Sequence, residues 1–295
     1  MRDVIQSTMS SLGWMVEVDT FQTSSVFDED VTFSNVVATQ DPDKPRQLVL
    51  SCHYDSKKSP TGFLGATDSA VPCAIILNIA TSLDSIIKMQ DKESGISLQL
   101  VFFDGEEQLY ENTLFGPDGL YGSKHMARKL KESSYTSNPG DTVRLGQFPV
   151  LVMTTRLGTW CQEGEATEMD RIDLLLLLDL IGAPAPFFEN YVDEETGLCN
   201  LFSDELSEIE NAIVGDVGDD QKYFHDFCWT IDDTVDDHTP FVDQGLRKNL
   251  HVISDPFPEV WHTMDDDWEH LEFESISRIN RIFRVFVAEY LNLEF

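Results

Sequence analysis

The sequence has few cationic residues. It contains 20 lysines and arginines against 53 aspartates and glutamates, so the formal net charge of the 295 residues is −33. A chain this acidic repels a polyphosphate backbone, which excludes nucleic-acid binding. Its charge favours neutral or cationic small partners. No apolar run approaches the ~20 residues that a transmembrane helix needs, so we expect no membrane span in this chain.

Cysteine is scarce, and its spacing does not fit a structural zinc knot. No two of the five cysteines form a C-x-x-C pair. The number is odd, so at least one thiol is free or bonds to another chain. The cysteines are Cys52, Cys73, Cys161, Cys199 and Cys228.

The N-terminus lacks the apolar segment of a signal peptide. Residues 1–14, MRDVIQSTMSSLGW, instead have the pattern of an amphipathic helix. Its expected apolar face comprises Val4, Ile5, Met9 and Leu12. We therefore expect the natural chain to begin earlier than this one.

No internal repeat or low-complexity linker divides the chain, so we expect a single domain over residues 1–295. Apolar strand patterns alternate with helical patterns. Strands are expected at 46–51, 97–103, 171–178 and 250–254, and helices at 69–88, 122–133 and 275–291. This alternation predicts an α/β fold in which helices sandwich a central, mostly parallel mixed β-sheet.

One stretch, residues 187–237, holds much of the acidic excess. It contains sixteen acidic residues and a single basic one, Lys222. Runs of like charge are usually solvated, so we expect an acidic surface insertion here.

Ionisable side chains follow each expected strand. His53 and Asp55 come after the first strand, and Glu106 and Glu107 after the second. Asp179 closes the third strand. Asp68 precedes the first long helix, for which Asp68 or Ser69 is the expected N-cap. His262 follows the fourth strand. Open α/β sheets bind ligands at the carboxyl ends of their strands, so we expect these groups to meet there.

This combination of side chains predicts a metal site. Asp179 ends a run of five leucines, where an ionised carboxylate is costly unless it is paired or bound to metal. Imidazole and carboxylate ligands suit zinc. Adjacent glutamates allow a division of labour in which Glu107 binds metal and Glu106 transfers protons.

Several segments resemble the animal glutaminyl-peptide cyclotransferases (glutaminyl cyclases), which are related in fold to the zinc-dependent M28 aminopeptidases. The resemblance runs in order from about Gly13 to Leu293. The segments that carry it are CHYDSK, GATDSAVPCA, LQLVFFDGEE, LYGSKH, LLLLLDLIGAPAP, DDHTPF and DPFPEVWHTMDD.

The resemblance implies a set of site residues. The zinc ligands, for one Zn²⁺ per chain, would be Asp68, Glu107 and His262. Glu106 would be the general acid/base, and Asp179 and Asp236 would support the site by hydrogen bonding. Phe257 and Trp261 would line the substrate pocket. Cys52 and Cys73 would form a disulfide, and the Asp68–Ser69 peptide would be cis. From the residues themselves, Asp265, Asp266 and Asp267 either support the site or begin the next helix, and the helix start is expected for Asp266 and Asp267.

The implied reaction is cyclisation of the N-terminal glutamine of a peptide or protein to pyroglutamate, with release of ammonia. The implied location is the secretory pathway or the cell exterior. The chain departs from the family at Asn112, near a position where many members have tryptophan, and at Val235, where relatives have glutamine. We expect these departures to alter the fine shape of the pocket and to leave the metal site unchanged.

Two alternatives remain at this stage. In a two-zinc aminopeptidase, His53 and Asp179 would hold a second zinc bridged by Asp68, and a water between the ions would attack the peptide bond. In a binding protein the chemistry would be lost. The second alternative is weak because no proposed ligand or base is missing.

Overall fold

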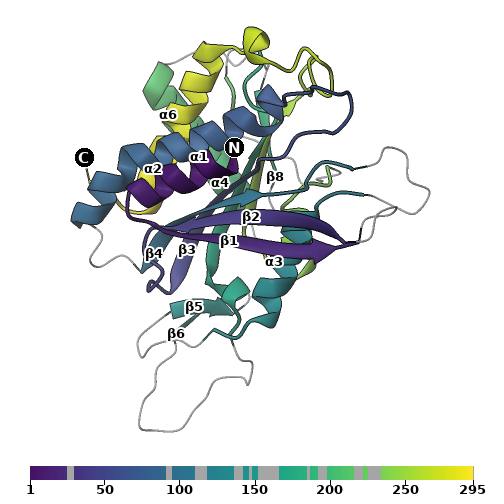
Figure 1. Cartoon of the computed structure of the whole chain (residues 1–295). Coiled ribbons are helices and arrows are strands. Elements are labelled where there is room, and N and C mark those ends of the chain that lie inside the picture. Colours follow the sequence, from purple (N-terminus) through teal and green to yellow (C-terminus); the bar gives the residue numbers. More distant parts are fainter. Residues whose placement is uncertain are drawn as a thin grey trace, which may run out of the picture.

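A seven-stranded mixed sheet organises the fold (Figure 1). The computed structural model describes residues 1–24, 30–90, 95–109, 118–135, 142–145, 148–151, 166–184, 187–191, 198–215, 222–224 and 234–294. The strands of this sheet are β1 (Met15–Thr23), β2 (Val31–Thr39), β3 (Arg46–His53), β4 (Ile96–Phe103), β7 (Ile172–Asp179), β8 (Phe187–Tyr191) and β9 (Asn249–Asp255). A separate hairpin consists of β5 (Thr142–Leu145) and β6 (Phe148–Leu151).

The strand order is β1-β2-β4-β3-β7-β9-β8. The four central strands, β4, β3, β7 and β9, run parallel to one another. At one edge β2 pairs antiparallel with β4 and β1 with β2, and at the other edge β8 pairs antiparallel with β9. All eight residues of β7 are buried, as expected for a strand covered on both faces. The predicted α/β class and mixed sheet are confirmed.

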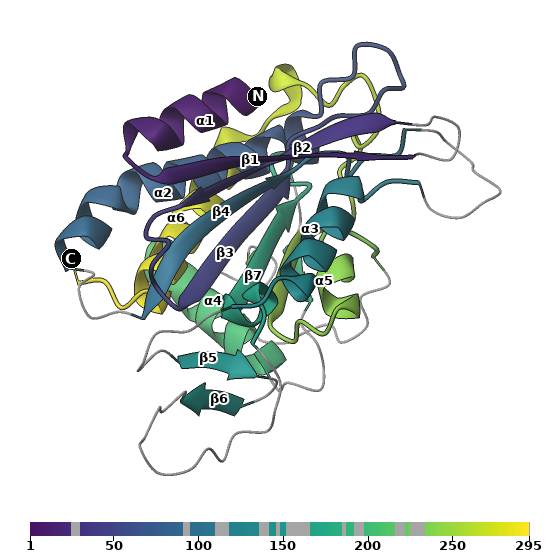
Figure 2. The ribbon, with the colours of Figure 1, turned by 60° about the horizontal axis from the view of Figure 1, so that its bottom comes forward.

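Helices cover both faces of the sheet (Figure 1, Figure 2). The larger core lies under α1 (Arg2–Ser11), α2 (Val71–Gln90), α4 (Leu198–Val214) and α6 (Phe273–Tyr290). The smaller core lies under α3 (Tyr121–Glu132) and α5 (Thr239–Asp243). Short turns of helix occur at Ala66–Ala70, Glu168–Arg171 and Trp268–His270. The expected helices α2, α3 and α6 are present, each within two residues of the predicted boundaries.

Two details at helix ends differ from expectation. Asp68 and Ser69 do not cap α2; they have non-helical backbone angles inside the Ala66–Ala70 turn, and α2 begins at Val71. Asp68 does not cap the helix because its carboxylate pairs with the imidazoles of His53 and His262. In α1, Ile5 and Met9 are buried as predicted, but Val4 is exposed.

The acidic region 187–237 differs from the surface insertion that we expected. Its described residues supply β8, which pairs with β9, and α4, which packs against α6. Within α4 the carboxylate of Glu210 is buried, where it pairs with Arg278 at 2.6 Å and accepts the backbone N–H of Tyr223. At least one of the acidic residues is therefore a structural part of the core.

In the described residues, one helical segment, Ala66–Met89, is apolar and long enough to cross a membrane by length and composition, with a mean hydropathy of 1.7. Half of that window is buried inside the fold. It contains α2, which contributes Ile76, Ile79 and Leu83 to the larger core. Its apolar composition is accounted for by this packing.

Candidate active site

The carboxyl ends of the parallel strands open into a pocket of about 400 Å³. Loops that follow β3, β4, β7 and β9 all contribute to it, as the position of polar groups after each strand predicted. Its lining includes eight of the residues singled out from the sequence: Asp68, Glu106, Glu107, Asp179, Asp236, Phe257, Trp261 and His262. His53 lies behind this lining and is 1 % exposed.

Asp68, Glu107 and His262 form a cluster in which the ligand atoms lie within 4.8 Å of one another. Nε2 of His262 is 3.2 Å from Oδ2 of Asp68 and 3.8 Å from Oε2 of Glu107. Oε1 of Glu107 is buried and accepts no hydrogen bond from any described residue. Two carboxylates and an imidazole that converge in this way are a donor set suited to zinc, with room for a fourth ligand.

The electrostatics of the cluster also fit a cation. Burial, followed by the charge of Asp68, raises the pKa of Glu107 to about 8. Burial acts in the same direction on Asp68, but hydrogen bonds from His262 and His53 outweigh it and lower the pKa of Asp68. A bound cation would relieve the repulsion between these two carboxylates and favour the ionised form of both.

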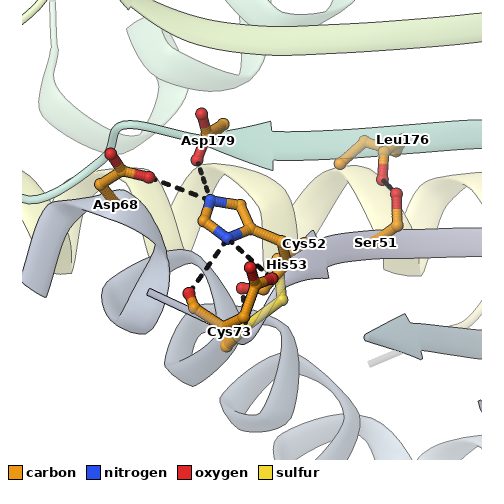
Figure 3. Close-up of a disulfide and its surroundings, with 8 residues drawn as sticks. Ser51, Cys52, His53, Asp68, Cys73, Leu176 and Asp179 are labelled. Carbon is orange, nitrogen blue, oxygen red and sulfur yellow. Dashed lines mark hydrogen bonds and ion pairs between the residues drawn. A yellow bond between two sulfur atoms is a disulfide. The ribbon is translucent and has the colours of Figure 1, made fainter. Parts of the chain in front are cut away.

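His53 joins the cluster to Asp179 (Figure 3). Its Nε2 lies 3.0 Å from Oδ1 of Asp68 and 3.3 Å from Oδ1 of Asp179, while its Nδ1 is 3.2 Å from the carbonyl oxygen of Asp55. Burial lowers the pKa of His53, but the hydrogen bonds to these three aspartates raise it well above its usual value. His53, Asp68 and Asp179 thus also form a three-ligand group that could hold a metal.

Glu106 lies where a carboxyl group holds a proton easily. Burial raises its pKa well above the usual value, and the charges of Asp236, Asp237 and Asp179 add to this effect, against an opposing effect of His53. Burial and then Asp236 also raise the pKa of Asp179, to about 6, although its hydrogen bond from His53 acts in the opposite direction. A carboxyl group that is tuned in this way can both accept and donate protons near neutral pH.

Asp236 is held by histidines that the sequence analysis gave no role. Nε2 of His251, within β9, lies 2.8 Å from Oδ2 of Asp236, and the ring of His238 stacks on His251 at 4.5 Å. Burial raises the pKa of Asp236, but the bond from His251 outweighs it and lowers the pKa. His238 was visible in the segment DDHTPF, whereas His251 sits inside an apolar strand and carried no signal of its own.

Asp55 was also assigned no role, yet it holds both glutamates in place. Its two carboxylate oxygens accept the backbone N–H groups of Glu106 and Glu107, each at 3.2 Å. Its side chain is 17 % exposed. One carboxylate therefore fixes the turn that presents the adjacent pair.

Backbone N–H groups at the start of α3 also hold the turn that carries Glu106 and Glu107. The N–H of Leu120 donates to the carbonyl of Glu106 at 3.0 Å, and that of Tyr121 to the carbonyl of Gly105 at 2.8 Å. At Gly122, an added Cβ would lie 2.3 Å from Oδ1 of Asn35 and 2.6 Å from the carbonyl oxygen of residue 104. Glycine at 122 thus permits the close approach of α3 to the turn.

Two of the three aspartates after His262, Asp266 and Asp267, have different roles. Oδ1 of Asp266 accepts the N–H of Thr67 at 2.8 Å, and its carbonyl accepts the N–H of Ala66, so it ties the His262 loop to the turn that carries Asp68. Asp267 caps the short helix Trp268–His270. Asp267 therefore begins a helix as expected, whereas Asp266, for which the same role was expected, supports the site. His262 itself has a left-handed backbone, with φ of 58°.

Aromatic side chains form one wall of the pocket. Phe257 and Trp261 meet edge to face with their ring centroids 4.9 Å apart, and Trp261 also stacks on His262. Val235, the departure noted above, lines the pocket and is 62 % exposed. Asn112 lies outside the described residues.

Cys52 and Cys73 form a disulfide between the end of β3 and the first turn of α2, and the Asp68–Ser69 peptide is cis. Both predictions are confirmed. The disulfide lies next to His53 (Figure 3).

Known proteins resemble this chain over most of its length. The model of peptidase family M28 matches residues 35–145 and 158–287. A glutaminyl-peptide cyclotransferase of Bos taurus is 39% identical over 292 residues, which are 95% of this chain and 72% of the relative. One of Drosophila melanogaster is 38% identical, over 98% of this chain and 74% of the relative. The crystal structure of Macrostomum lignano glutaminyl cyclase superposes with a TM-score of 0.80 at 30% identity, and the match covers 99% of this chain and 82% of that one.

Proposed function

The chain belongs to the glutaminyl-peptide cyclotransferases, within peptidase family M28, and we propose that it converts N-terminal glutamine of peptides and proteins to pyroglutamate. The α-amine attacks the γ-amide carbon of the same residue, the C–N bond to the amide nitrogen breaks, and ammonia leaves. The observation that carries the proposal is the carboxyl group of Glu106 beside the cluster of Asp68, Glu107 and His262 in one pocket.

We propose that Asp68, Glu107 and His262 hold one Zn²⁺. A zinc ion there supplies Lewis-acid polarisation of the γ-carbonyl. Because the nucleophile is the substrate's own amine, the reaction needs no water held between two metals. His53 and Asp179 then hold no metal and are available for hydrogen bonding. Nε2 of His53 lies 3.3 Å from Oδ1 of Asp179.

Glu106 is proposed to carry the proton. The α-amine loses one proton when the new C–N bond forms, and the departing NH₂ group gains one to become ammonia. A single carboxyl group can perform both transfers in turn, and the raised pKa of Glu106 matches this task. Asp179 and Asp236 are proposed to orient the substrate by hydrogen bonding, and Phe257 and Trp261 to enclose its side chain.

The disulfide supports a location in an oxidising compartment. Such bonds persist in the secretory pathway and outside the cell, whereas the cytosol keeps thiols reduced. We therefore propose that the protein acts in the secretory pathway or outside the cell, on peptides that begin with glutamine.

Mass analysis of two peptides, together with metal content, tests the assignment. With an N-terminal glutamine peptide, the expected product is lighter by one ammonia and retains the whole chain. With an N-terminal leucine peptide, no reaction is expected, and the protein should contain one zinc per chain. Free leucine with two zincs per chain would instead establish the two-zinc aminopeptidase, for which His53, Asp68 and Asp179 offer ligands.

A further inference from the structure

A second pocket of about 570 Å³ adjoins the active-site pocket. The two share three lining residues, Leu120, Lys124 and Val235, so they lie side by side on the molecule. The end of β1, α3 and α5 supply most of the lining of the second pocket. Both helices lie on the same face of the sheet (Figure 2). We call this second pocket the α3 groove.

The α3 groove is cationic in a protein whose formal net charge is −33. Lys124, His125 and Arg128 line it, and Asp243 is the acidic residue among its described lining. Lys124 and Arg128 are one helical turn apart on α3, and both are exposed. The chain thus places positive charge beside its active site, although its formal net charge is strongly negative.

The basic side chains of α3 differ in whether they have carboxylate partners. Lys129 pairs with Asp19 at 2.9 Å and with Glu17 at 3.2 Å, and His125 lies 3.3 Å from Asp19. Nζ of Lys124 donates to the carbonyl of Gly119 at 2.8 Å but pairs with no carboxylate among the described residues. Arg128 likewise has no carboxylate partner in the described part of the chain. Two uncompensated cations therefore face the groove.

We propose that the α3 groove binds the part of the substrate peptide that follows the N-terminal glutamine, and that it selects peptides with acidic side chains there. The inference rests on the proposed function, because it takes the first residue to occupy the adjoining pocket. An extended chain advances about 3.3–3.6 Å per residue, so residues three and four lie roughly 7–10 Å beyond the glutamine. Val235, exposed at the junction, gives the passing backbone an apolar contact.

Charges next to the bound peptide affect its binding more than the net charge of the whole molecule does. At 0.15 M ionic strength the Debye length is about 8 Å, so the many distant carboxylates are screened from a bound peptide. Carboxylates in contact with Lys124 and Arg128 are screened much less. Exposed ion pairs are individually weak, so two of them correspond to a preference of about three- to tenfold.

The test compares three amidated peptides at 0.15 M salt: Gln-Gly-Glu-Glu-Ala-Ala, Gln-Gly-Gln-Gln-Ala-Ala and Gln-Gly-Lys-Lys-Ala-Ala. Ammonia release gives kcat and KM for each. We expect kcat/KM of the glutamate peptide to exceed that of its uncharged isostere by about three- to tenfold. The difference should reside in KM, because the contact is remote from the reacting bond.

Two variants locate the effect on the protein. The double variant Lys124→Gln with Arg128→Gln should bring the ratio of the two kcat/KM values close to one. Lys131→Gln removes the same charge from the same helix, outside the described lining of the groove, and should leave the ratio as in the unaltered protein. Thermal melting of each variant checks that it is folded. Should the double variant not fold, Arg128→Glu serves instead, with the expectation that the lysine peptide becomes the preferred one.

The outcomes separate the two proposals. Three results would refute the proposed role of the α3 groove and leave the cyclase assignment intact. They are equal kcat/KM for the three peptides, a preference for the lysine peptide in the unaltered protein, and a ratio of kcat/KM values that is unchanged in the double variant. Absence of pyroglutamyl product from every peptide overturns the proposed function and, with it, the groove.

Discussion

Asp55 offers a sharp test of how the turn after β4 is built. The carboxylate accepts the backbone N–H groups of both Glu106 and Glu107 at 3.2 Å. In Asp55→Ala both donors lose their acceptor, and a buried donor without a partner costs about 1–3 kcal/mol. We take a total of about 2–4 kcal/mol, since the site is partly open to water. Unfolding entropy near 2.1 cal/mol/K per residue then lowers Tm by about 3–7 °C for a chain of this length.

The same substitution should lower activity, because the displaced turn carries the proton carrier and a proposed zinc ligand. Loss of a residue that orients metal ligands commonly costs about 10–100-fold in metal affinity or activity. We expect kcat for ammonia release to fall by that factor with zinc in excess, and a chelator to remove zinc at lower concentration. Asp55→Asn retains one acceptor oxygen, so its Tm and kcat should lie between those of Asp55→Ala and the unaltered protein.

Asp41→Ala is the matched control. Oδ1 of Asp41 also accepts a backbone N–H, that of Asp43, but in an exposed turn before β3. Its loss should change stability by less than about 0.5 kcal/mol and leave kcat unchanged. Two results would refute the positioning role of Asp55. One is a Tm of Asp55→Ala equal to that of Asp41→Ala; the other is a loss of several degrees in Tm with unchanged kcat and unchanged sensitivity to the chelator.

Four further changes probe separate parts of the molecule. Glu106→Gln should retain zinc and lose about 10²–10⁴-fold in kcat, as judged by metal analysis and ammonia release; a near-normal rate would reassign the proton carrier. Asp68→Ala should be isolated without zinc, and full metal occupancy would contradict the ligand set. Replacing Cys52 and Cys73 together by alanine opens a loop with a sequence separation of 21, so it should cost about 3 kcal/mol and lower Tm in a melting curve. Gly122→Ala should be destabilising by about 1–3 kcal/mol despite the better helix propensity of alanine, because its Cβ would overlap backbone and side-chain atoms; a higher Tm would refute this packing argument.

The central sheet was predictable because parallel strands buried on both faces leave continuous apolar runs. The leucines of β7 are the clearest example. The edge strands were missed, although MVEVDTFQT in β1 alternates apolar and polar residues, as a half-buried strand does. The acidic region 187–237 was expected to be a surface insertion. Charge density there indicated solvent exposure, yet β8 and α4 belong to the sandwich.

The strand-end residues of the site were predictable for a topological reason. Parallel strands place their carboxyl ends at one edge, so the polar groups that follow them were expected to meet there. The choice of Asp68, Glu107 and His262 among these groups came from the resemblance to the cyclases. The support for Asp236 was not predictable in this way. His251 points from the interior of β9 to a carboxylate fifteen positions earlier in a connecting loop, and only tertiary packing brings the two together.

The loops at the carboxyl edge of the sheet hold exposed and buried residues side by side. Val235 is 62 % exposed and belongs to neither hydrophobic core, and a substitution at such a surface position typically shifts stability by no more than about 0.5 kcal/mol. Asp236, the next residue, is 3 % exposed and bound to His251. Two adjacent positions therefore differ in what a substitution is expected to cost: a change at Val235 alters the rim of the pocket, whereas a change at Asp236 removes a buried ion pair.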